Sequence, residues 1–202
     1  MGEHYYSNSP SSSSNPSSFR FPLRNEQFLF HTDSGVFSKK EVDFGSRLLI
    51  ESFYENEELE GNILDVGCGY GPIGISMAKS FPKRNVEMID VNERAIALAK
   101  KNASENGVSN VQIHMSNIYE SVPKENKYAY IFSNPPIRAG KQVVHTILEE
   151  AKSYLLPDGE LWIVIQKKQG APSALEKLEA LFGEVEVVEK KKGYYIIKSK
   201  NS

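Results

Sequence analysis

The regular alternation of short apolar runs with amphipathic segments, from residue 62 onward, constrains the fold of this chain more than any other feature. A short apolar run between turn residues is typical of a buried strand, and apolar residues spaced three or four apart are typical of a helix. Their alternation predicts an α/β fold: a Rossmann-like, doubly wound, mostly parallel sheet of seven strands with a C-terminal antiparallel hairpin. The expected strands span residues 63–66, 86–89, 111–115, 128–132, 161–165, 185–188 and 194–197.

Helices are expected between these strands. Pro72 suits the first turn of a helix, where its missing N–H costs nothing, and Asn92 is a good N-cap. Apolar residues at helical spacing predict further helices over residues 144–151 and 175–181, and an earlier one over residues 40–53.

The N-terminal segment differs from the rest in composition. Residues 7–18 are almost entirely Ser, Asn and Pro, which cannot bury enough apolar surface to offset their ordering entropy. We therefore expect a disordered tail over residues 1–18. The remaining residues, 19–202, suffice for one α/β domain, and a hairpin and helix over residues 19–55 are expected to cover its ligand site.

Bulk composition excludes several classes of protein. The formal net charge of −2 gives no overall basic signature, so any nucleic-acid contact must come from a local patch. A single cysteine, Cys68, excludes an internal disulfide, and the four histidines lack the spacing of metal ligands. No apolar run approaches membrane-spanning length. We expect a cytoplasmic protein without a metal or a membrane contact.

A glycine cluster, Asp65 to Gly71, follows the first parallel strand, and Gly69 to Gly74 matches the GxGxxG spacing of dinucleotide sites. Asp90 ends the next strand, where a carboxylate can accept hydrogen bonds from ribose hydroxyls. Asp65 and Asp90 should face the same crevice, which disfavours the pyrophosphate of NAD. The sulfonium and ammonium groups of S-adenosylmethionine suit this field better, so the sequence favours that cofactor.

Asn134-Pro135-Pro136 follows the fourth expected strand. Asn134 Oδ1 and the Pro135 carbonyl can each accept one N–H of a planar amine, whose delocalised lone pair otherwise makes it a poor nucleophile. The two prolines fix the backbone that carries these acceptors. Beside a site for S-adenosylmethionine, this arrangement predicts methyl transfer to an exocyclic amine.

The glycine cluster, Asp90 and Asn134-Pro135-Pro136 resemble motifs I, II and IV of the class I S-adenosylmethionine-dependent methyltransferases. The resemblance covers residues 19–200. The resemblance implies a catalytic group of Asn134, Pro135 and Pro136, followed by Ile137 where base-modifying relatives often carry an aromatic residue. It also implies a contact with the adenine after the third strand. The cofactor-binding residues that it implies are Asp65, Gly67, Gly69, Gly71, Asp90, Val91, Asn117, Ile118 and Asn134.

Three longer runs are similar to the catalytic domain of the ribosomal RNA small subunit methyltransferase C family: Asp33 to Ser38, Asp43 to Ser46 and Asn134 to Lys141. Members of that family methylate the N2 amine of a guanine in small-subunit ribosomal RNA. The resemblance therefore implies ribosomal RNA or the small ribosomal subunit as partner. It also places Phe37 and Ser38 over the methionine end of the cofactor.

Basic residues follow two of the expected strands. Arg138 and Lys141 come directly after the Asn-Pro-Pro motif, and Lys167 and Lys168 come after the buried strand 161–165. Together with Ile137, they are the predicted substrate-binding residues, because they could neutralise several RNA phosphates at the mouth of the site. The lysines at 190–192 are interpreted as a solvated hairpin turn.

Two other functions remain open from the sequence. The same Asn134 grip suits the side-chain amide of a glutamine in a protein, although relatives of that type usually carry Tyr where this chain has Ile137. A non-catalytic cofactor-binding or RNA-binding module is the other alternative. The complete set of acidic, glycine and amide residues described above argues against a decayed site.

Overall fold

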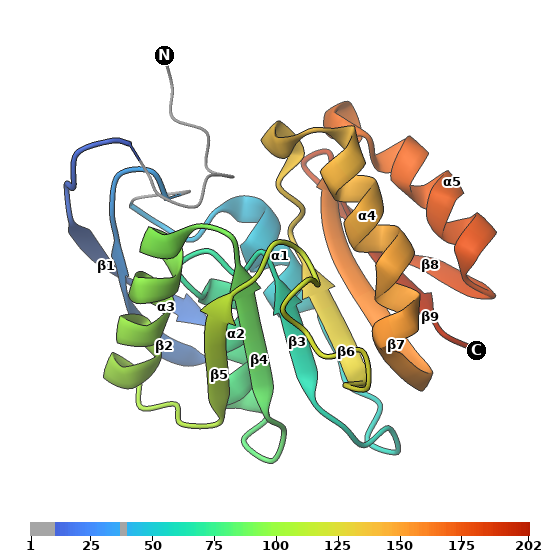
Figure 1. The fold of residues 1–202 in the computed structure, drawn as a ribbon, viewed down its shortest axis with the longest axis horizontal. Coiled ribbons are helices and arrows are strands. Elements are labelled where there is room, and N and C mark those ends of the chain that lie inside the picture. The colour runs from blue at the N-terminus through green and yellow to red at the C-terminus, as the bar shows by residue number, and fades with distance from the viewer. Residues whose placement is uncertain (1–10, 37–39) are drawn as a thin grey trace.

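The computed structural model describes residues 11–36 and 40–202 (Figure 1). Helices and strands alternate along the chain as the sequence predicts. In chain order the elements are β1 (Ser17–Leu23), β2 (Glu26–Thr32), α1 (Phe44–Ser52), β3 (Ile63–Val66), α2 (Pro72–Ser80), β4 (Val86–Asp90), α3 (Glu93–Glu105), β5 (Val111–Met115), β6 (Tyr128–Ser133), η1 (Ile137–Ala139), α4 (Lys141–Ala151), η2 (Lys152–Tyr154), β7 (Leu155–Gln166), η3 (Lys167–Gln169), α5 (Ala171–Leu181), β8 (Glu184–Lys191) and β9 (Tyr194–Lys200), where η marks a 3₁₀ helix.

The central sheet has seven strands in the order β5-β4-β3-β6-β7-β9-β8. Strands β3 to β7 are parallel, and β9 pairs antiparallel with both β7 and β8. The predicted sheet and its closing hairpin are therefore confirmed. The carboxyl ends of the parallel strands share one edge of the sheet, at the top of Figure 1, which we call the carboxyl edge.

Helices cover the two faces of the sheet and form two cores. Helices α1 and α2 pack on the face that carries Tyr130, Phe132 and Trp162, and α4 and α5 pack on the face that carries Ile131 and Ile163 (Figure 1). Alternate residues of one strand thus enter opposite cores. Because β6 and β7 are buried on both faces, they read as continuous apolar runs in the sequence, as expected for central parallel strands.

The N-terminal hairpin β1–β2 forms a separate two-stranded sheet that packs on α3. Asn102 of α3 joins the two, because its fully buried side chain accepts a hydrogen bond from His31 N (2.8 Å) and donates to His31 O (3.0 Å). The same amide donates to Tyr70 O in the glycine cluster (2.8 Å). The hairpin is thereby fixed beside the glycine cluster.

The folded structure begins earlier than the sequence predicts. Strand β1 starts at Ser17, two residues before the expected boundary at Phe19. Ser14 Oγ and Asn15 N both donate to the carboxylate of Asp33, so part of the segment expected to be disordered contacts the domain. The Ser/Asn/Pro composition predicts no core contribution, but it leaves hydroxyl and amide groups that can bond to a polar loop.

Helix α1 begins later than predicted, at Phe44 and not near Lys40. Asp43 is its N-cap and accepts a hydrogen bond from Ser46 N (3.0 Å). Asp is among the preferred N-cap residues because it satisfies a backbone donor that the first turn leaves free. The apolar pattern extends beyond the helix, whereas the cap fixes where the helix starts.

Candidate active site

The glycine cluster forms the turn between β3 and α2 at the carboxyl edge. Gly67, Gly69 and Gly71 have φ angles of 75°, 59° and 107°, a region that other residues rarely adopt. A Cβ on Gly67 would meet no atom of the described chain within 4 Å, so the backbone there borders open space. The backbone conformation itself thus favours glycine at these positions, and at Gly67 it leaves room for a ligand.

Asp65 lies in β3 directly below this turn and is fully buried. Its Oδ2 accepts a hydrogen bond from Gly74 N in the first turn of α2 (2.9 Å). Its Oδ1 has no partner among the residues that the structure describes. Burial raises the pKa of Asp65 to about 7, and the nearby carboxylate of Asp90 adds to the shift. An unpartnered buried carboxylate oxygen next to a glycine turn fits a ligand that carries N–H donors and positive charge.

Asp90 ends β4, the neighbour of β3, and its side chain is only 3% exposed. One carboxylate oxygen accepts from Gly69 N (2.8 Å) and the other from Asn92 N (2.8 Å). A carboxylate oxygen can accept more than one hydrogen bond, so a side chain of this kind can also accept from hydroxyl groups of a ligand. Val91, the next predicted residue, follows Asp90 in the chain and is buried.

Asn117 and Ile118 follow β5 at the same edge. Asn117 is exposed and donates to Glu120 Oε1 (3.3 Å). Ile118 has a φ of 56°, an unusual value for a β-branched residue, and its carbonyl accepts from Ser116 Oγ (2.7 Å). Such strain often marks a binding loop, and a contact of these two residues with the cofactor stays a prediction.

Asn134 follows β6, the other neighbour of β3, and contacts the start of α1. Its Nδ2 donates to Asp43 Oδ2 (3.1 Å) and to Ser46 Oγ (3.0 Å). Both amide hydrogens are engaged, and its Oδ1 bonds to no residue in the described part of the chain. The amide therefore presents its oxygen as the remaining polar group. Asp43 and Ser46 were not predicted as site residues.

Two neighbouring strands bring Asn134 and the glycine cluster together. Ser133 pairs with Val66 in the register of β6 and β3, and its Oγ donates to Val66 O (2.9 Å). Gly67 and Asn134 are the next residues of the two strands. The position predicted for the methyl donor and the position predicted for the acceptor grip thus lie side by side at the carboxyl edge.

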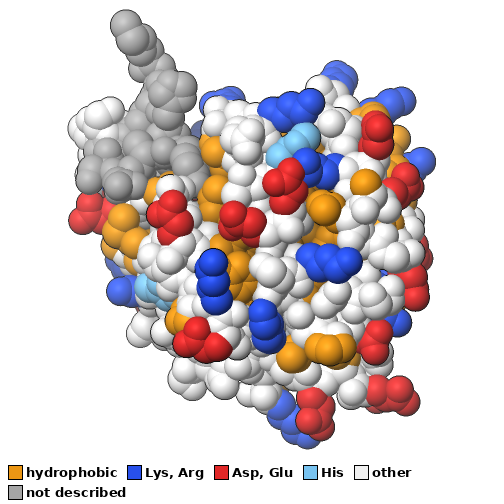
Figure 2. All heavy atoms as spheres, turned by 45° about the vertical axis from the view of Figure 1, so that its right-hand side comes forward, with side chains coloured by type: hydrophobic (Ala, Val, Ile, Leu, Met, Phe, Trp, Pro, Cys, Tyr) orange, Lys and Arg blue, Asp and Glu red, His pale blue; other side chains and the backbone are white. Residues whose placement is uncertain are grey.

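The predicted substrate-binding residues surround this edge. Ile137 and Arg138 lie in η1, Lys141 starts α4, and Lys167 and Lys168 lie in η3 after β7. The arginine and the three lysines are all exposed. In Figure 2, several Lys and Arg side chains gather along the upper part of the molecule, where the carboxyl edge lies.

The hairpin turn between β8 and β9 reaches the same edge, which the sequence analysis did not anticipate. Lys167 N donates to Gly193 O (2.7 Å), and Lys192 Nζ lies 4.8 Å from the ring centre of Phe44 at the start of α1. The turn lies there because β9 pairs antiparallel with β7, which places Tyr194 at the start of β9 opposite Gln166 at the end of β7. The sequence pattern alone did not predict this pairing. Arg138, Lys141, Lys167, Lys168 and Lys192 are called the basic rim below.

Two further points concern this region. Phe37 and Ser38, predicted to cover the cofactor, lie outside the described residues. Cys68, inside the glycine cluster, is buried, and burial followed by the carboxylates of Asp90 and Asp65 raises the pKa of its thiol far above the usual range. A thiol in this environment is a poor nucleophile.

No group of three or more His, Cys, Asp or Glu residues within 11–36 and 40–202 is arranged to hold a metal ion. In the same ranges, no helix is long and apolar enough to cross a membrane.

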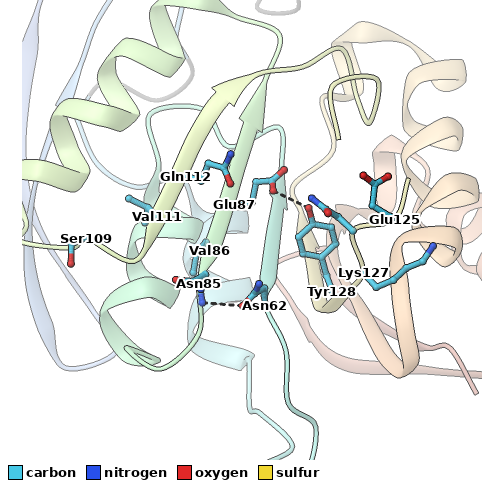
Figure 3. Close-up of a pocket in the computed structure, with 11 residues that line it drawn as sticks. Asn62, Asn85, Val86, Glu87, Ser109, Val111, Gln112, Glu125, Lys127 and Tyr128 are labelled. Carbon is cyan, nitrogen blue, oxygen red and sulfur yellow. Dashed lines mark hydrogen bonds between the residues drawn. The ribbon is translucent and has the colours of Figure 1, made fainter. Parts of the chain in front are cut away.

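A polar pocket of about 460 Å³ lies at the opposite edge of the sheet (Figure 3). It is lined by residues at the amino-terminal ends of β4, β5 and β6, including Gln112 and Tyr128. Glu87 points into this region and accepts a hydrogen bond from Tyr128 Oη (2.9 Å). The pocket is separated from the carboxyl edge by the length of the strands, so it takes no part in the site described above.

Solved structures with the same architecture define the class of this fold. The T. thermophilus 16S rRNA N2 methyltransferase RsmC, solved in complex with AdoMet and guanosine, superposes with a TM-score of 0.82 at 23% identity. The match covers 96% of this chain and 52% of that one. The predicted Rossmann-like methyltransferase fold is therefore confirmed.

Family membership follows from the sequence comparison. This chain belongs to the methyltransferase small domain family, whose model matches residues 27–198. It is 63% identical over 200 residues to the uncharacterized protein YbxB of Bacillus subtilis, covering 99% of both chains. It is 34% identical over 167 residues to the ribosomal RNA small subunit methyltransferase C of Photorhabdus laumondii. That match covers 81% of this chain and 47% of the relative, so the chain spans about half the length of such relatives.

Proposed function

We propose that this protein is an S-adenosylmethionine-dependent N-methyltransferase that modifies the exocyclic N2 amine of a guanine in small-subunit ribosomal RNA. The family membership supports methyl transfer, and the predicted cofactor agrees with the AdoMet in the T. thermophilus structure. The RNA target rests on relatives named ribosomal RNA small subunit methyltransferase C. The match to one of them has 34% identity and covers 47% of its length.

The orientation of Asn134 is the observation that carries the proposal. Its two amide hydrogens are engaged with Asp43 and Ser46, so its oxygen is the group that can meet a substrate. An oxygen acceptor selects a substrate atom that carries hydrogen, such as an amine nitrogen. The position of Asn134 beside the glycine cluster supports methyl transfer between the two turns.

The cofactor residues that we propose are those predicted from the sequence. Asp65, with its unpartnered oxygen, would hold the amino acid end, and Asp90 would accept from the ribose hydroxyls. Gly67, Gly69 and Gly71 would allow close approach of the backbone. Asn117 and Ile118 would border the adenine. When bound, S-adenosylmethionine supplies an electrophilic methyl group on a positively charged sulfur.

The chain itself would orient the amine. Asn134 Oδ1 and the Pro135 carbonyl each accept one N–H, which draws the nitrogen toward a tetrahedral geometry and directs its lone pair at the methyl group. The turn after the motif uses the carbonyls of Pro136 and Ile137 as acceptors for Ala139 N and Gly140 N. Asn134 Oδ1 would still accept an N–H of the amine after the transfer, when the nitrogen would carry a positive charge and would release a proton to solvent.

The basic rim supports a polyanionic substrate. Its five cationic side chains lie around the carboxyl edge on three separate segments, although the protein as a whole carries a net charge of −2. Phosphate contacts from such a rim would position RNA without reading its sequence. Ile137 would supply an apolar contact for the target base.

A tritiated-methyl transfer assay tests the proposal. The purified protein is incubated with labelled S-adenosylmethionine and, separately, with unmodified small-subunit ribosomal RNA, small ribosomal subunits and protein extract, and products are hydrolysed to nucleosides or amino acids. We expect label in N2-methylguanosine. Label in glutamine would replace the RNA target with a protein, and label in another nucleoside would exclude the N2 amine.

Variants connect the activity to the site. Asn134→Ala should lower kcat by about 10²- to 10³-fold, because it removes one preorganised acceptor. Calorimetry should detect cofactor binding that is largely retained, because the other predicted cofactor residues stay in place. Asn85→Ala, the same change at the opposite edge, serves as the control. Asp90→Ala should abolish measurable cofactor binding. Full turnover by Asn134→Ala would remove this residue from the mechanism.

A further inference from the structure

The carboxylate of Asp43 has two roles in the structure. Its Oδ2 caps α1 by accepting from Ser46 N (3.0 Å) and also accepts from Asn134 Nδ2 (3.1 Å). The Ser46 hydroxyl bonds to the same carboxylate and accepts the second amide hydrogen of Asn134 (3.0 Å). These three side chains form a closed set of hydrogen bonds between the start of α1 and the end of β6.

This set distinguishes the two ends of the Asn134 amide. A primary amide has nearly the same shape when its nitrogen and oxygen exchange places, so packing alone does not select one orientation. With the amide reversed, Asn134 Oδ1 would face the carboxylate of Asp43, and two acceptors would lie opposite each other without a hydrogen between them. An ionised carboxylate can only accept, so it selects the orientation in which Nδ2 faces α1.

The start of α1 is itself held firmly. Gly45 packs so closely on Tyr194 of β9 that an added Cβ would lie 3.1 Å from the Tyr194 ring. The rings of Phe44 and Tyr194 are in contact, with their centres 5.4 Å apart. Helix α1 also packs on β7 and α2. Asp43 and Ser46 are therefore anchored to the sheet independently of Asn134.

We propose that Asp43 and Ser46 are positioning residues that fix the side-chain amide of Asn134 so that its oxygen, and not its nitrogen, faces the methyl acceptor. Neither residue touches the substrate in this scheme. The inference rests on the proposed role of Asn134 as an acceptor for the substrate N–H. It assigns a second function to Asp43, the N-cap of α1.

A pair of substitutions separates this role from helix capping. Asp43→Ser keeps a good N-cap but is too short to reach Asn134, whereas Asp43→Asn is isosteric and keeps an oxygen that can accept from both Ser46 N and Asn134. We expect Asp43→Ser to lower kcat by about 10- to 100-fold, because the amide loses its fixed orientation. Asp43→Asn should restore kcat to within about threefold of wild type, since a neutral oxygen still accepts both bonds. Cofactor affinity should be unchanged in both variants.

A second readout does not depend on activity. The Nδ2 hydrogens of Asn134 give a side-chain amide signal in ¹⁵N-resolved NMR, and two strong hydrogen bonds should slow their exchange with water. Asp43→Ser should increase that exchange rate by at least about tenfold, as expected when a hydrogen bond to a charged group is lost. If Asp43→Ser does not fold, Ser46→Ala is the substitute variant, because it removes one acceptor and leaves the capping carboxylate in place.

A double-mutant cycle with Asn134→Ala completes the test. If Asp43 acts through Asn134, Asp43→Ser should cause no further loss of kcat in the Asn134→Ala background. The positioning role would be overturned if Asp43→Ser lowered kcat by the same factor in the Asn134→Ala background as in the wild type. It would also be overturned if Asp43→Ser changed neither kcat nor the amide exchange rate. Full activity of Asn134→Ala by itself would instead refute the proposed function, so the two failures can be told apart.

Discussion

Replacement of Asp65 by Asn should stabilise the cofactor-free protein at neutral and alkaline pH. Burial, reinforced by Asp90, raises the pKa of this carboxyl from 3.8 to about 7. At about 1.4 kcal/mol per pKa unit, the ionised form costs about 4 kcal/mol in the folded state. In Asp65→Asn, the amide oxygen can still accept from Gly74 N, while the unpartnered Oδ1 is replaced by an NH2 group whose burial costs about 1 to 2 kcal/mol. The net gain is about 2 to 3 kcal/mol.

The gain should depend on pH in a defined direction. The unfolded chain releases the Asp65 proton near pH 3.8 and the folded chain releases it near pH 7. Between these values the folded protein binds more protons than the unfolded one, so raising the pH lowers the stability of the wild type. The penalty is absent below about pH 4 and complete above about pH 7. The advantage of Asp65→Asn should therefore be close to zero at pH 5 and fully present at pH 8.

Thermal unfolding of both proteins at pH 5 and pH 8 measures this difference. For a domain of this size we expect Tm to rise by about 4 to 12 °C at pH 8. Asp158→Asn is the matched control, because it removes a carboxylate that is 65% exposed. A Tm difference that is the same at both pH values, or a less stable variant at pH 8, would refute the argument. The same variant should bind S-adenosylmethionine more weakly.

Two further predictions concern the hairpin and the basic rim. Asn102→Ala should destabilise the protein by about 3 kcal/mol, because it removes the side-chain partner of two partly buried backbone groups of His31 and of the buried carbonyl of Tyr70. Urea unfolding measures this loss, and a loss below about 1 kcal/mol would contradict the prediction. Arg138→Ala and Lys141→Ala should each weaken RNA binding and flatten the dependence of log K on log salt by about 0.7 to 0.9. Lys83→Ala, in the loop before β4, is the control, and an unchanged slope in the rim variants would exclude the phosphate contacts.

Most of the fold follows from local patterns in the sequence. Strands β3 to β6 are predicted because they are short runs set off by turn residues or by helical periodicity, and parallel topology follows from the alternation of strands with helices. Strand β7, expected over residues 161–165, begins earlier, at Leu155. The first and last residues of the elements are predicted less well from the sequence. Helix α1 starts after its N-cap Asp43, although the apolar pattern does not change at that residue. Strand β1 starts inside a Ser-rich run whose backbone pairs with β2. Composition indicates the absence of a core, but it does not report backbone pairing.

The site was predictable where its residues follow parallel strands. Asp65, Asp90 and Asn134 could be placed together because parallel strands end at one edge. Asp43 and Lys192 could not, since each reaches the site through tertiary contacts: one through helix α1 and the other through an antiparallel hairpin. The role of Asp43 also required the direction of a side-chain amide, which depends on three groups that are distant in the sequence.

The pairing of β3 with β6 has a consequence for how such a domain can diversify. Neighbouring strands in a sheet lie about 4.8 Å apart, so the separation between the glycine turn and the Asn-Pro-Pro turn is inherited from backbone hydrogen bonding. Changes in η1, η3 or the β8–β9 turn would alter which molecule docks at the edge without moving the two turns apart. A new substrate could thus be acquired by surface substitution alone, while the reaction distance stays a fixed dimension of the sheet.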